Sequence, residues 1–283
     1  MIACPRLQVM LGAAVALCLT ASFAHAQEAS LVTVDGRRIE VMRAGVGSPT
    51  IVLESGFGGS ADSWQSLLPE LGRVSHVIAY SRAGLGKSDP RSTPPSPKVV
   101  VEELRSLLRA LEVRGPVVLV GHSLGGLFAR LYVSLYGDEV SGLVLVDGTH
   151  EAQWLRWQRL SPSLNLADSL QVSLARASPS LRAEGELFAA IERAGSVEGL
   201  HPLPDLPLAV LTAVRPCAGS WSCSDSAAIR SWREGHDEWF ARSTTGVHFV
   251  STATTHDFIT EEPHLLVSAV RFVVDAARKQ ARK

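Results

Sequence analysis

The chain has 283 residues, enough for one large domain or two small ones, and no Pro-, Gly- or Ser-rich linker divides it in the middle. Its hydrophobic share of 46% and charged share of 19% exclude a disordered or fibrous protein and are typical of a globular one. A formal net charge of -1 excludes a general attraction to nucleic acid or to an anionic membrane surface, and it favours a small neutral or mildly polar substrate.

Residues 1–26 have the features of a cleavable signal peptide. Arg6 supplies a positive charge, residues 7–23 are mostly apolar, and the Ala-His-Ala sequence at 24–26 is a small-x-small cleavage site. A retained membrane anchor would need about 20 apolar residues, more than this stretch contains. We therefore expect the domain of residues 27–283 to be periplasmic or secreted, with no stable membrane span once the signal is removed.

The four cysteines divide between the signal peptide and the domain. Cys4 and Cys18 lie in the signal, and lipidation at Cys18 is disfavoured because a leucine precedes it instead of a small residue. Cys217 and Cys223 remain, and an oxidising compartment would join them in a disulfide bond. Two free buried thiols are the alternative, and metal binding is disfavoured because residues 218–222 supply no His or carboxylate.

Short apolar runs alternate with longer amphipathic stretches through most of the domain, which is typical of a parallel sheet covered by helices on both faces. Residues 31–34 and 39–41 flank an Asp-Gly turn and predict an opening β-hairpin. Further buried strands are expected at residues 50–54, 76–80, 117–121, 142–147, 207–214 and 247–252. The predicted fold class is therefore α/β.

Two long helices are expected to cover this sheet. Residues 100–111 carry apolar side chains at helical spacing and charged ones on the other face, with prolines at the helix entry. Residues 262–279 begin beside Pro263 and end in basic residues that suit the helix dipole.

Residues 150–205 break the alternation, because they are rich in tryptophan and leucine at helix-like spacings and contain no strand candidate. We expect a helical insertion that forms a cap over the carboxyl ends of the strands, where α/β sheets bind ligands. A helical excursion at the side of the sheet, without a substrate role, is the alternative. The cap is favoured because so many apolar residues must cover an apolar surface.

The sequence Gly-His-Ser-Leu-Gly-Gly at 121–126 follows an apolar strand and precedes a helical stretch at 127–136. This is the context of a nucleophile elbow, in which a tight turn presents the serine hydroxyl at a helix N-terminus. The pattern therefore predicts Ser123 as a nucleophile. A Gly-rich helix start without chemistry is the alternative.

Four segments together resemble the α/β-hydrolase superfamily, and particularly its bacterial esterase-like members. They are VLESGFGGSADSW at 52–64, YSRAGLGKS at 80–88, the elbow at 121–126 and LVDGTH at 145–150. The resemblance runs from about residue 31 to the C-terminus. It implies an α/β-hydrolase fold, a mostly parallel sheet with helices on both faces and a helical cap, and a serine hydrolase that needs no metal or organic cofactor.

The resemblance also assigns two loops. Residues 55–59 take the place of the superfamily's His-Gly-x-Gly loop, so that the Phe57 N–H is one donor of an oxyanion hole and the Leu124 N–H is the other. A plain turn is the alternative for this loop. In the second loop the chain has Ser81 where aspartate is usual, and Arg82 is expected to fix the backbone and not to act in catalysis.

His256 is the predicted general base among nine histidines. It follows the last predicted strand in a segment that resembles the superfamily's base motif, and the chain order of Ser before His agrees. His248 and His264 are lesser candidates.

Asp147 is the predicted acid that holds the histidine, because it follows the strand at 142–146 directly. Asp225 is the alternative, which the disulfide loop could carry back toward the sheet. Capping a helix or loop would be another role for Asp147.

These residues predict an exported serine hydrolase that cleaves a carboxylic ester of a small molecule through an acyl-enzyme on Ser123, a carboxylesterase of the EC 3.1.1 type. Lactones, amides or peptides, and carbon–carbon bonds beside a ketone remain alternatives, as does a non-catalytic binding protein. The sequence leaves the oligomeric state open.

Overall fold

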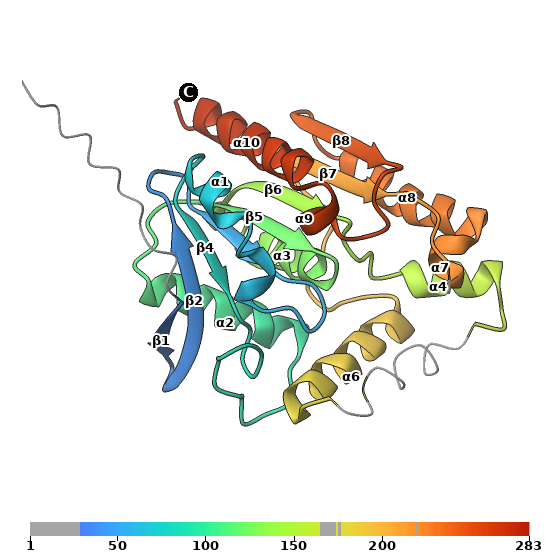
Figure 1. Cartoon of the computed structure of the whole chain (residues 1–283), viewed down its shortest axis with the longest axis horizontal. Helices are drawn as coiled ribbons and strands as arrows, with labels where there is room; N and C mark the ends of the chain where they lie inside the picture. The colour runs from blue at the N-terminus through green and yellow to red at the C-terminus, as the bar shows by residue number, and fades with distance from the viewer. Residues whose placement is uncertain (1–28, 165–173, 175–176, 219, 283) are drawn as a thin grey trace, which may run out of the picture.

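The computed structural model of the chain describes residues 29–164, 174, 177–218 and 220–282 (Figure 1). The expected signal peptide at 1–26 lies outside the described residues. The described part contains an eight-stranded sheet in the order β1-β2-β4-β3-β5-β6-β7-β8. The strands are β1 (Ser30–Val34), β2 (Arg37–Ala44), β3 (Ile51–Glu54), β4 (Val77–Tyr80), β5 (Val117–His122), β6 (Val140–Val146), β7 (Leu208–Ala213) and β8 (Gly246–Ser251).

The first two strands form the predicted hairpin, and β2 also pairs antiparallel with β4. All later pairings, from β4–β3 to β7–β8, are parallel. The strands β3, β4 and β7 are buried throughout, as expected for strands covered on both faces. The predicted mostly parallel α/β sheet is confirmed.

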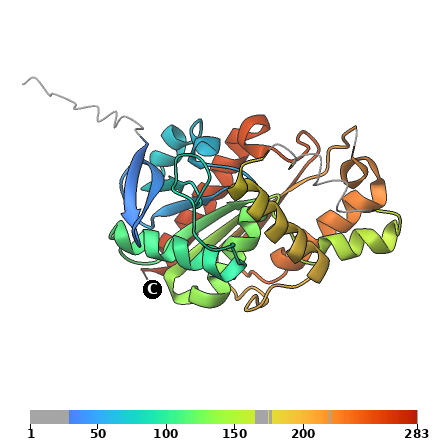
Figure 2. The same cartoon turned by 90° about the horizontal axis from the view of Figure 1, so that it is seen from below.

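Helices cover both faces of the sheet (Figures 1 and 2). They are α1 (Leu68–Gly72), α2 (Pro97–Ala110), α3 (Leu124–Tyr136), α4 (Gln153–Leu160), α6 (Pro179–Ala194), α7 (Trp221–Ser224), α8 (Ser226–Phe240), α9 (Phe258–Glu261) and α10 (Pro263–Gln280), with two short 3-10 turns at Ala61–Trp64 and Gly137–Glu139. Side chains of α2, α3 and the end of α8 form one core cluster, and those of α1, α9 and α10 form the other on the opposite face. Among the described residues, no helix is long and apolar enough to cross a membrane.

The start of α2 shows how the sequence sets a boundary. Ser96 Oγ accepts the Val99 N–H at 3.3 Å, and Pro97 occupies the first turn, where no N–H partner is needed. The helix therefore begins three residues before the apolar pattern that predicts it. Helix α10 also begins at a proline, Pro263, but no side chain among the described residues caps it.

The helix α8 has no counterpart among the expected elements. Its buried positions include Ser231, Gly235 and His236, so its inner face is partly polar and gives no apolar period. Between β6 and β7 the described residues form α4 and α6, within the segment 150–205. Figure 1 shows α6 apart from the sheet, with its first turn beside the loop between β4 and α2.

Candidate active site

Ser123 lies at the sharp turn between β5 and α3. Its φ of 53° and ψ of -123° fall in a region that residues other than glycine rarely adopt. Glycines make the turn possible: a Cβ atom added to Gly121 would lie 2.5 Å from Gly125 O, and one added to Gly125 would lie 2.3 Å from Glu54 O. The serine is thereby presented at the N-terminus of α3, where the helix dipole favours negative charge.

Asp147 and His256 are brought together from positions 109 residues apart. Asp147 directly follows β6, and its N–H donates to Leu211 O of β7. His256 lies in the loop between β8 and α9. Asp147 Oδ2 is 2.5 Å from His256 Nδ1. A proton on Nδ1 leaves the lone pair of Nε2 available, as a general base requires.

The second oxygen of Asp147 is held as well. Asp147 Oδ1 accepts the Ala213 N–H at 2.9 Å and the Trp232 Nε1–H at 2.8 Å, and the residue is 2% exposed. These two bonds fix the carboxylate so that Oδ2 faces the histidine. Trp232, on α8, was not indicated by the sequence, because nothing near it in the chain sets it apart from the other tryptophans.

The alternative acid, Asp225, has a different position. Its Oδ1 accepts the N–H groups of Ala227 and Ala228 at 2.8 and 3.1 Å, which makes it the N-cap of α8. Within the described part of the chain it forms no hydrogen bond with His256. Helix capping, which the sequence left open as a role for Asp147, is thus the role of Asp225.

The lesser histidine candidates lie elsewhere. His248, on β8, contacts Thr212 Oγ1 through Nε2 at 2.7 Å and Asp237 Oδ1 through Nδ1 at 3.1 Å, so both ring nitrogens are engaged. His264 is exposed on α10. His248 therefore also pairs with a carboxylate, but its Nε2 is engaged by Thr212, and in the part of the chain that the structure describes neither His248 nor His264 lines a cavity with Ser123.

The pKa shifts of the pair have opposite directions. Burial lowers the pKa of His256, but the hydrogen bond and charge of Asp147 outweigh it, and the net pKa lies above the ordinary 6.5. Burial raises the pKa of Asp147, but the bond to His256 and its charge outweigh this, and the net pKa is lowered. The carboxylate is therefore ionised beside an imidazole that is more basic than usual.

His122, the residue before the serine, supports the histidine loop. Its Nε2 lies 3.2 Å from His256 O, and the two rings lie 4.7 Å apart. Burial, followed by the charge of His256, lowers the pKa of His122 to about 4, so the ring is neutral at neutral pH. A neutral ring that faces a carbonyl through Nε2 carries its proton there and donates it to His256 O.

The two expected oxyanion donors border the serine from both sides. A Cβ atom added to Gly56 would lie 3.1 Å from Ser123 Cβ, so the loop carrying Phe57 approaches the elbow closely. Leu124 is the first residue of α3. Among the described residues, neither the Phe57 N–H nor the Leu124 N–H donates a hydrogen bond, and both remain available to a ligand.

The position of Ser81, where aspartate is usual in the superfamily, is explained by a neighbouring strand. Ser81 Oγ donates to Glu40 Oε2 at 2.7 Å and accepts the Ala61 N–H at 2.9 Å. The same Glu40 oxygen accepts the Lys87 N–H at 2.9 Å. The buried carboxylate of Glu40 on β2 thus supplies the negative charge that the loop itself lacks.

Comparison with known proteins agrees with this geometry. Residues 49–181 match the family model described as the alpha/beta hydrolase fold. The matched segment and the mostly parallel sheet show that the chain has the α/β-hydrolase fold.

Individual relatives of this α/β hydrolase were also found. The chain is 27% identical over 253 residues to a Bacillus subtilis protein named YqjL, covering 88% of this chain and 93% of that protein. It is 29% identical over 117 residues to a 2-hydroxy-6-oxo-6-(2'-aminophenyl)hexa-2,4-dienoic acid hydrolase of Metapseudomonas resinovorans, covering 41% and 40%. The crystal structure of a bacterial membrane phospholipase A superposes with a TM-score of 0.62 at 21% identity, covering 89% of this chain and 86% of that one, and so shares the fold.

Two cavities of this α/β hydrolase meet at Ser123 and His256. One, of about 260 Å³, is also lined by Asp147 and by apolar or aromatic side chains that include Trp157, Ile229 and Trp232. The other, of about 420 Å³, is lined by the loop with Phe57 and by the start of α9. No hydrogen bond joins Ser123 Oγ to the His256 ring in the described part of the chain, and such bonds often form only with substrate bound.

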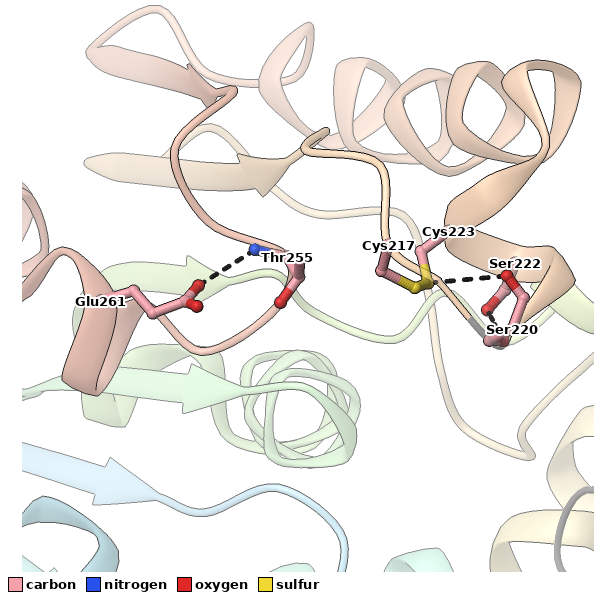
Figure 3. The surroundings of a disulfide bond; sticks show 6 residues. All are labelled: Cys217, Ser220, Ser222, Cys223, Thr255 and Glu261. Carbon is pink, nitrogen blue, oxygen red and sulfur yellow. Dashed lines mark hydrogen bonds between the residues drawn. A yellow bond between two sulfur atoms is a disulfide. The ribbon is translucent and has the colours of Figure 1, made fainter.

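Cys217 and Cys223 form a disulfide bond (Figure 3), and Cys223 lines the smaller cavity. Its Cα atoms are 5.2 Å apart. Figure 3 shows it beside the loop with Thr255, the residue before His256, and both Cys223 and Thr255 line that cavity. The cysteine pairing is confirmed. Among the described residues, no three His, Cys, Asp or Glu side chains form a group that could hold a metal ion.

Proposed function

We propose that this α/β hydrolase is an exported carboxylesterase in which Ser123, His256 and Asp147 form a catalytic triad. Ser123 Oγ attacks the ester carbonyl carbon while His256 Nε2 takes the hydroxyl proton. His256 then protonates the departing alcohol oxygen, and an acyl-enzyme remains. Water, deprotonated by the same nitrogen, releases the acid and restores the serine.

One observation carries this proposal: the 2.5 Å contact between Asp147 Oδ2 and His256 Nδ1 at a cavity that Ser123 also lines. The contact orients the imidazole and stabilises the charged ring that forms when His256 takes the serine proton. The left-handed backbone of Ser123 adds support, because strain of this kind persists where the surrounding structure requires it.

The proposed oxyanion hole consists of the Phe57 and Leu124 N–H groups. Both flank the serine and neither donates a hydrogen bond within the described residues. Donors arranged before the reaction stabilise the negative oxygen of the tetrahedral intermediate, and each is worth about 3 kcal/mol of the barrier.

An ester is the proposed substrate because its carbonyl needs the least activation among the bonds this machinery could cleave. Trp157, Ile229 and Trp232 make one side of the site apolar, which suits a hydrocarbon acyl or alcohol group. Export is supported by the disulfide bond, since such bonds persist in oxidising compartments, and by the signal-like residues 1–26. We propose that α4 and α6 belong to the cap that selects the substrate.

Hydrolysis of a carbon–carbon bond beside a ketone is a second candidate. The similarity to the dienoic acid hydrolase favours it. Arg215, which lines the smaller cavity, offers a cation to a substrate carboxylate, although Glu261 pairs with it at 2.5 Å. Turnover of a dienoic acid but not of simple esters would favour this second candidate over the first.

Release of p-nitrophenol from short- and long-chain acyl esters tests the proposal. We expect Ser123→Ala to lose nearly all activity, about 10⁴-fold or more, because no other group can form the acyl-enzyme. Asp147→Asn is expected to lose most of its rate and Asp225→Asn to retain it. Activity that survives Ser123→Ala would overturn the mechanism, and a selective loss in Asp225→Asn would reassign the acid.

A further inference from the structure

The guanidinium of Arg82 holds the loop that follows β3. Arg82 is 3% exposed, and its Nη1 donates to Glu54 Oε1 and to Ser55 O at 2.6 Å each. Its Nη2 donates to Gly56 O at 2.7 Å. The planar, rigid fork of an arginine fixes the directions of these acceptors relative to one another.

This arrangement sets the direction of a proposed oxyanion donor. The Gly56–Phe57 peptide bond is trans, since the cis bond in the described part of the chain is at Ser48–Pro49. In a planar trans peptide the C=O and the following N–H point in opposite directions. Arg82, by holding Gly56 O, therefore also holds the Phe57 N–H.

Glu184 of α6 completes the network from the opposite side. Its Oε1 accepts from Arg82 Nε and its Oε2 accepts the Gly58 N–H, both at 2.7 Å, and the residue is 4% exposed. The Phe57 ring also stacks on the Phe188 ring of α6, with centroids 6.1 Å apart. The Glu184 carboxylate, more than 100 residues away in the chain, thus binds both the loop of residues 55–59 and the arginine that orients this loop.

We propose that Glu184 and Arg82 are positioning residues that assemble the oxyanion hole when α6 is seated against the loop of residues 55–59. The inference rests on the proposed function, because it concerns the same Phe57 donor. It assigns α6 a part in the chemical step as well as in covering the site.

A positioning role has a kinetic signature. The oxyanion exists only along the reaction path, so a misplaced donor weakens binding of the transition state and leaves binding of the substrate largely unchanged. Loss of kcat with little change in KM is therefore expected. A helix that only shaped the substrate cavity would instead change KM.

Glu184→Gln is the sharpest variant. The two carboxylate oxygens each face a donor, whereas a glutamine offers one oxygen and one NH2 group, so one of the two bonds must be lost. The Arg82 guanidinium keeps Glu54 as its partner, and the buried charge stays paired. Glu186→Gln is the matched control, because Glu186 is exposed on the same helix.

We expect Glu184→Gln to lower kcat for p-nitrophenyl esters by about 10- to 100-fold with KM within about threefold of wild type. A trifluoromethyl ketone, which forms a tetrahedral adduct with Ser123, should bind weaker by the same factor as kcat/KM falls. Binding of the alcohol product, which presents no carbonyl or carboxylate oxygen to the donors, should change little. Glu186→Gln should match wild type in all three measurements.

Other outcomes overturn the inference. If Glu184→Gln behaves as Glu186→Gln does, or if KM alone rises, Glu184 does not position the donor. If Glu184→Gln fails to fold, as seen by circular dichroism, Arg82→Lys replaces it, since an ammonium lacks the fork, and wild-type kcat in that variant contradicts the proposal. Hydrolysis that persists in Ser123→Ala marks the different case in which the proposed function itself is wrong.

Discussion

The carboxylate of Asp147 accepts hydrogen bonds from Ala213, Trp232 and His256, which come from β7, α8 and the loop after β8. Three donors from three elements leave the carboxylate no freedom to turn away from the imidazole. The direction of each pKa shift in the pair follows from this one contact, and so does the pH range in which the protein should act.

The ester kcat/KM is expected to rise with pH as His256 loses its proton, with a midpoint above 6.5 because Asp147 raises the pKa of the ring. Asp147→Asn removes the charge and, with its one oxygen still bonded to Ala213 and Trp232, turns an NH2 group toward His256 Nδ1, so this midpoint should move to lower pH. The ring signals of His256 in an NMR titration measure it even where activity is weak. An unchanged midpoint in Asp147→Asn would contradict the pairing, and Asp225→Asn should leave it in place.

At this scale the sequence indicated residues that stand next to a strand end or in a tight glycine turn. Ser123 and Asp147 are such residues, and His256 follows the last strand closely. Trp232 and Glu184 could not be predicted, because each reaches the site from a helix by a side-chain contact that no local pattern records.

The helices α4 and α6 are joined by a buried acid. Glu192 Oε2 accepts the Trp154 N–H at 3.0 Å, and Glu192 is 4% exposed. Burial raises its pKa to about 8, opposed by that hydrogen bond and reinforced by the charge of Glu151. The folded protein therefore holds a proton here that the unfolded chain releases near pH 4.5.

This carboxyl makes stability fall as pH rises from about 4.5 to 8, because the native state binds more protons than the unfolded one in that window. Glu192→Gln has no such proton to lose. We expect the change that it makes in the free energy of unfolding, variant minus wild type, to be more favourable at pH 8 than at pH 5 by about 1–3 kcal/mol. Thermal unfolding of Glu192→Gln and of the exposed control Glu186→Gln at both pH values measures the difference. Equal shifts in the two variants would refute the buried-acid interpretation.

The disulfide segment and α7 shape the smaller cavity. Replacing Cys217 and Cys223 together by serine should cost about 2 kcal/mol of stability, since the unfolded chain regains the freedom of a short closed loop. The same variant should change the ratio of kcat/KM for long and short acyl esters, because Cys223 lines the cavity. A variant that is less stable yet has the wild-type ratio would show that the loop does not select substrate.

The sequence predicted those helices and strands whose buried positions are mostly apolar and therefore produce a regular hydrophobic pattern. The central strands are apolar on both faces, and α2 and α10 each carry an apolar stripe, so their periods are visible. The helix α8 was missed because glycine, serine and histidine occupy its inner face, where they hydrogen-bond or pack closely. From this helix Trp232 donates to Asp147, and His236 contacts the carbonyl oxygen of the next residue, Gly148.

In the whole molecule, parallel strands carry the functional groups to one edge of the sheet. β3, β5, β6 and β7 each end beside a residue of the site, at Ser55, Ser123, Asp147 and Ala213 respectively. Because these strands are parallel and paired in register, their carboxyl ends lie at the same edge of the sheet. Residues far apart in sequence are therefore brought together by the strands and not by contacts among themselves.

Export of the whole chain is tested by its N-terminus after expression with its own first 26 residues. The Ala-His-Ala site at 24–26 predicts an exported protein, periplasmic or secreted, that begins at Gln27, and intact mass would detect it. Ala26→Glu should block processing, because signal peptidase sites require a small residue there. Recovery of the unprocessed wild-type chain in the cytoplasm would contradict export.

The two cavities that meet at Ser123 bear on the order of events during turnover. In the proposed ester hydrolysis, a substrate that spans both cavities would have its scissile bond at the junction, and the alcohol would leave from one side while the acyl group still fills the other. The cavity that the alcohol has left is then the route by which water, or another alcohol, reaches the acyl-enzyme. We therefore expect the dimensions and polarity of that cavity, more than the proposed triad, to decide whether water or another alcohol accepts the acyl group.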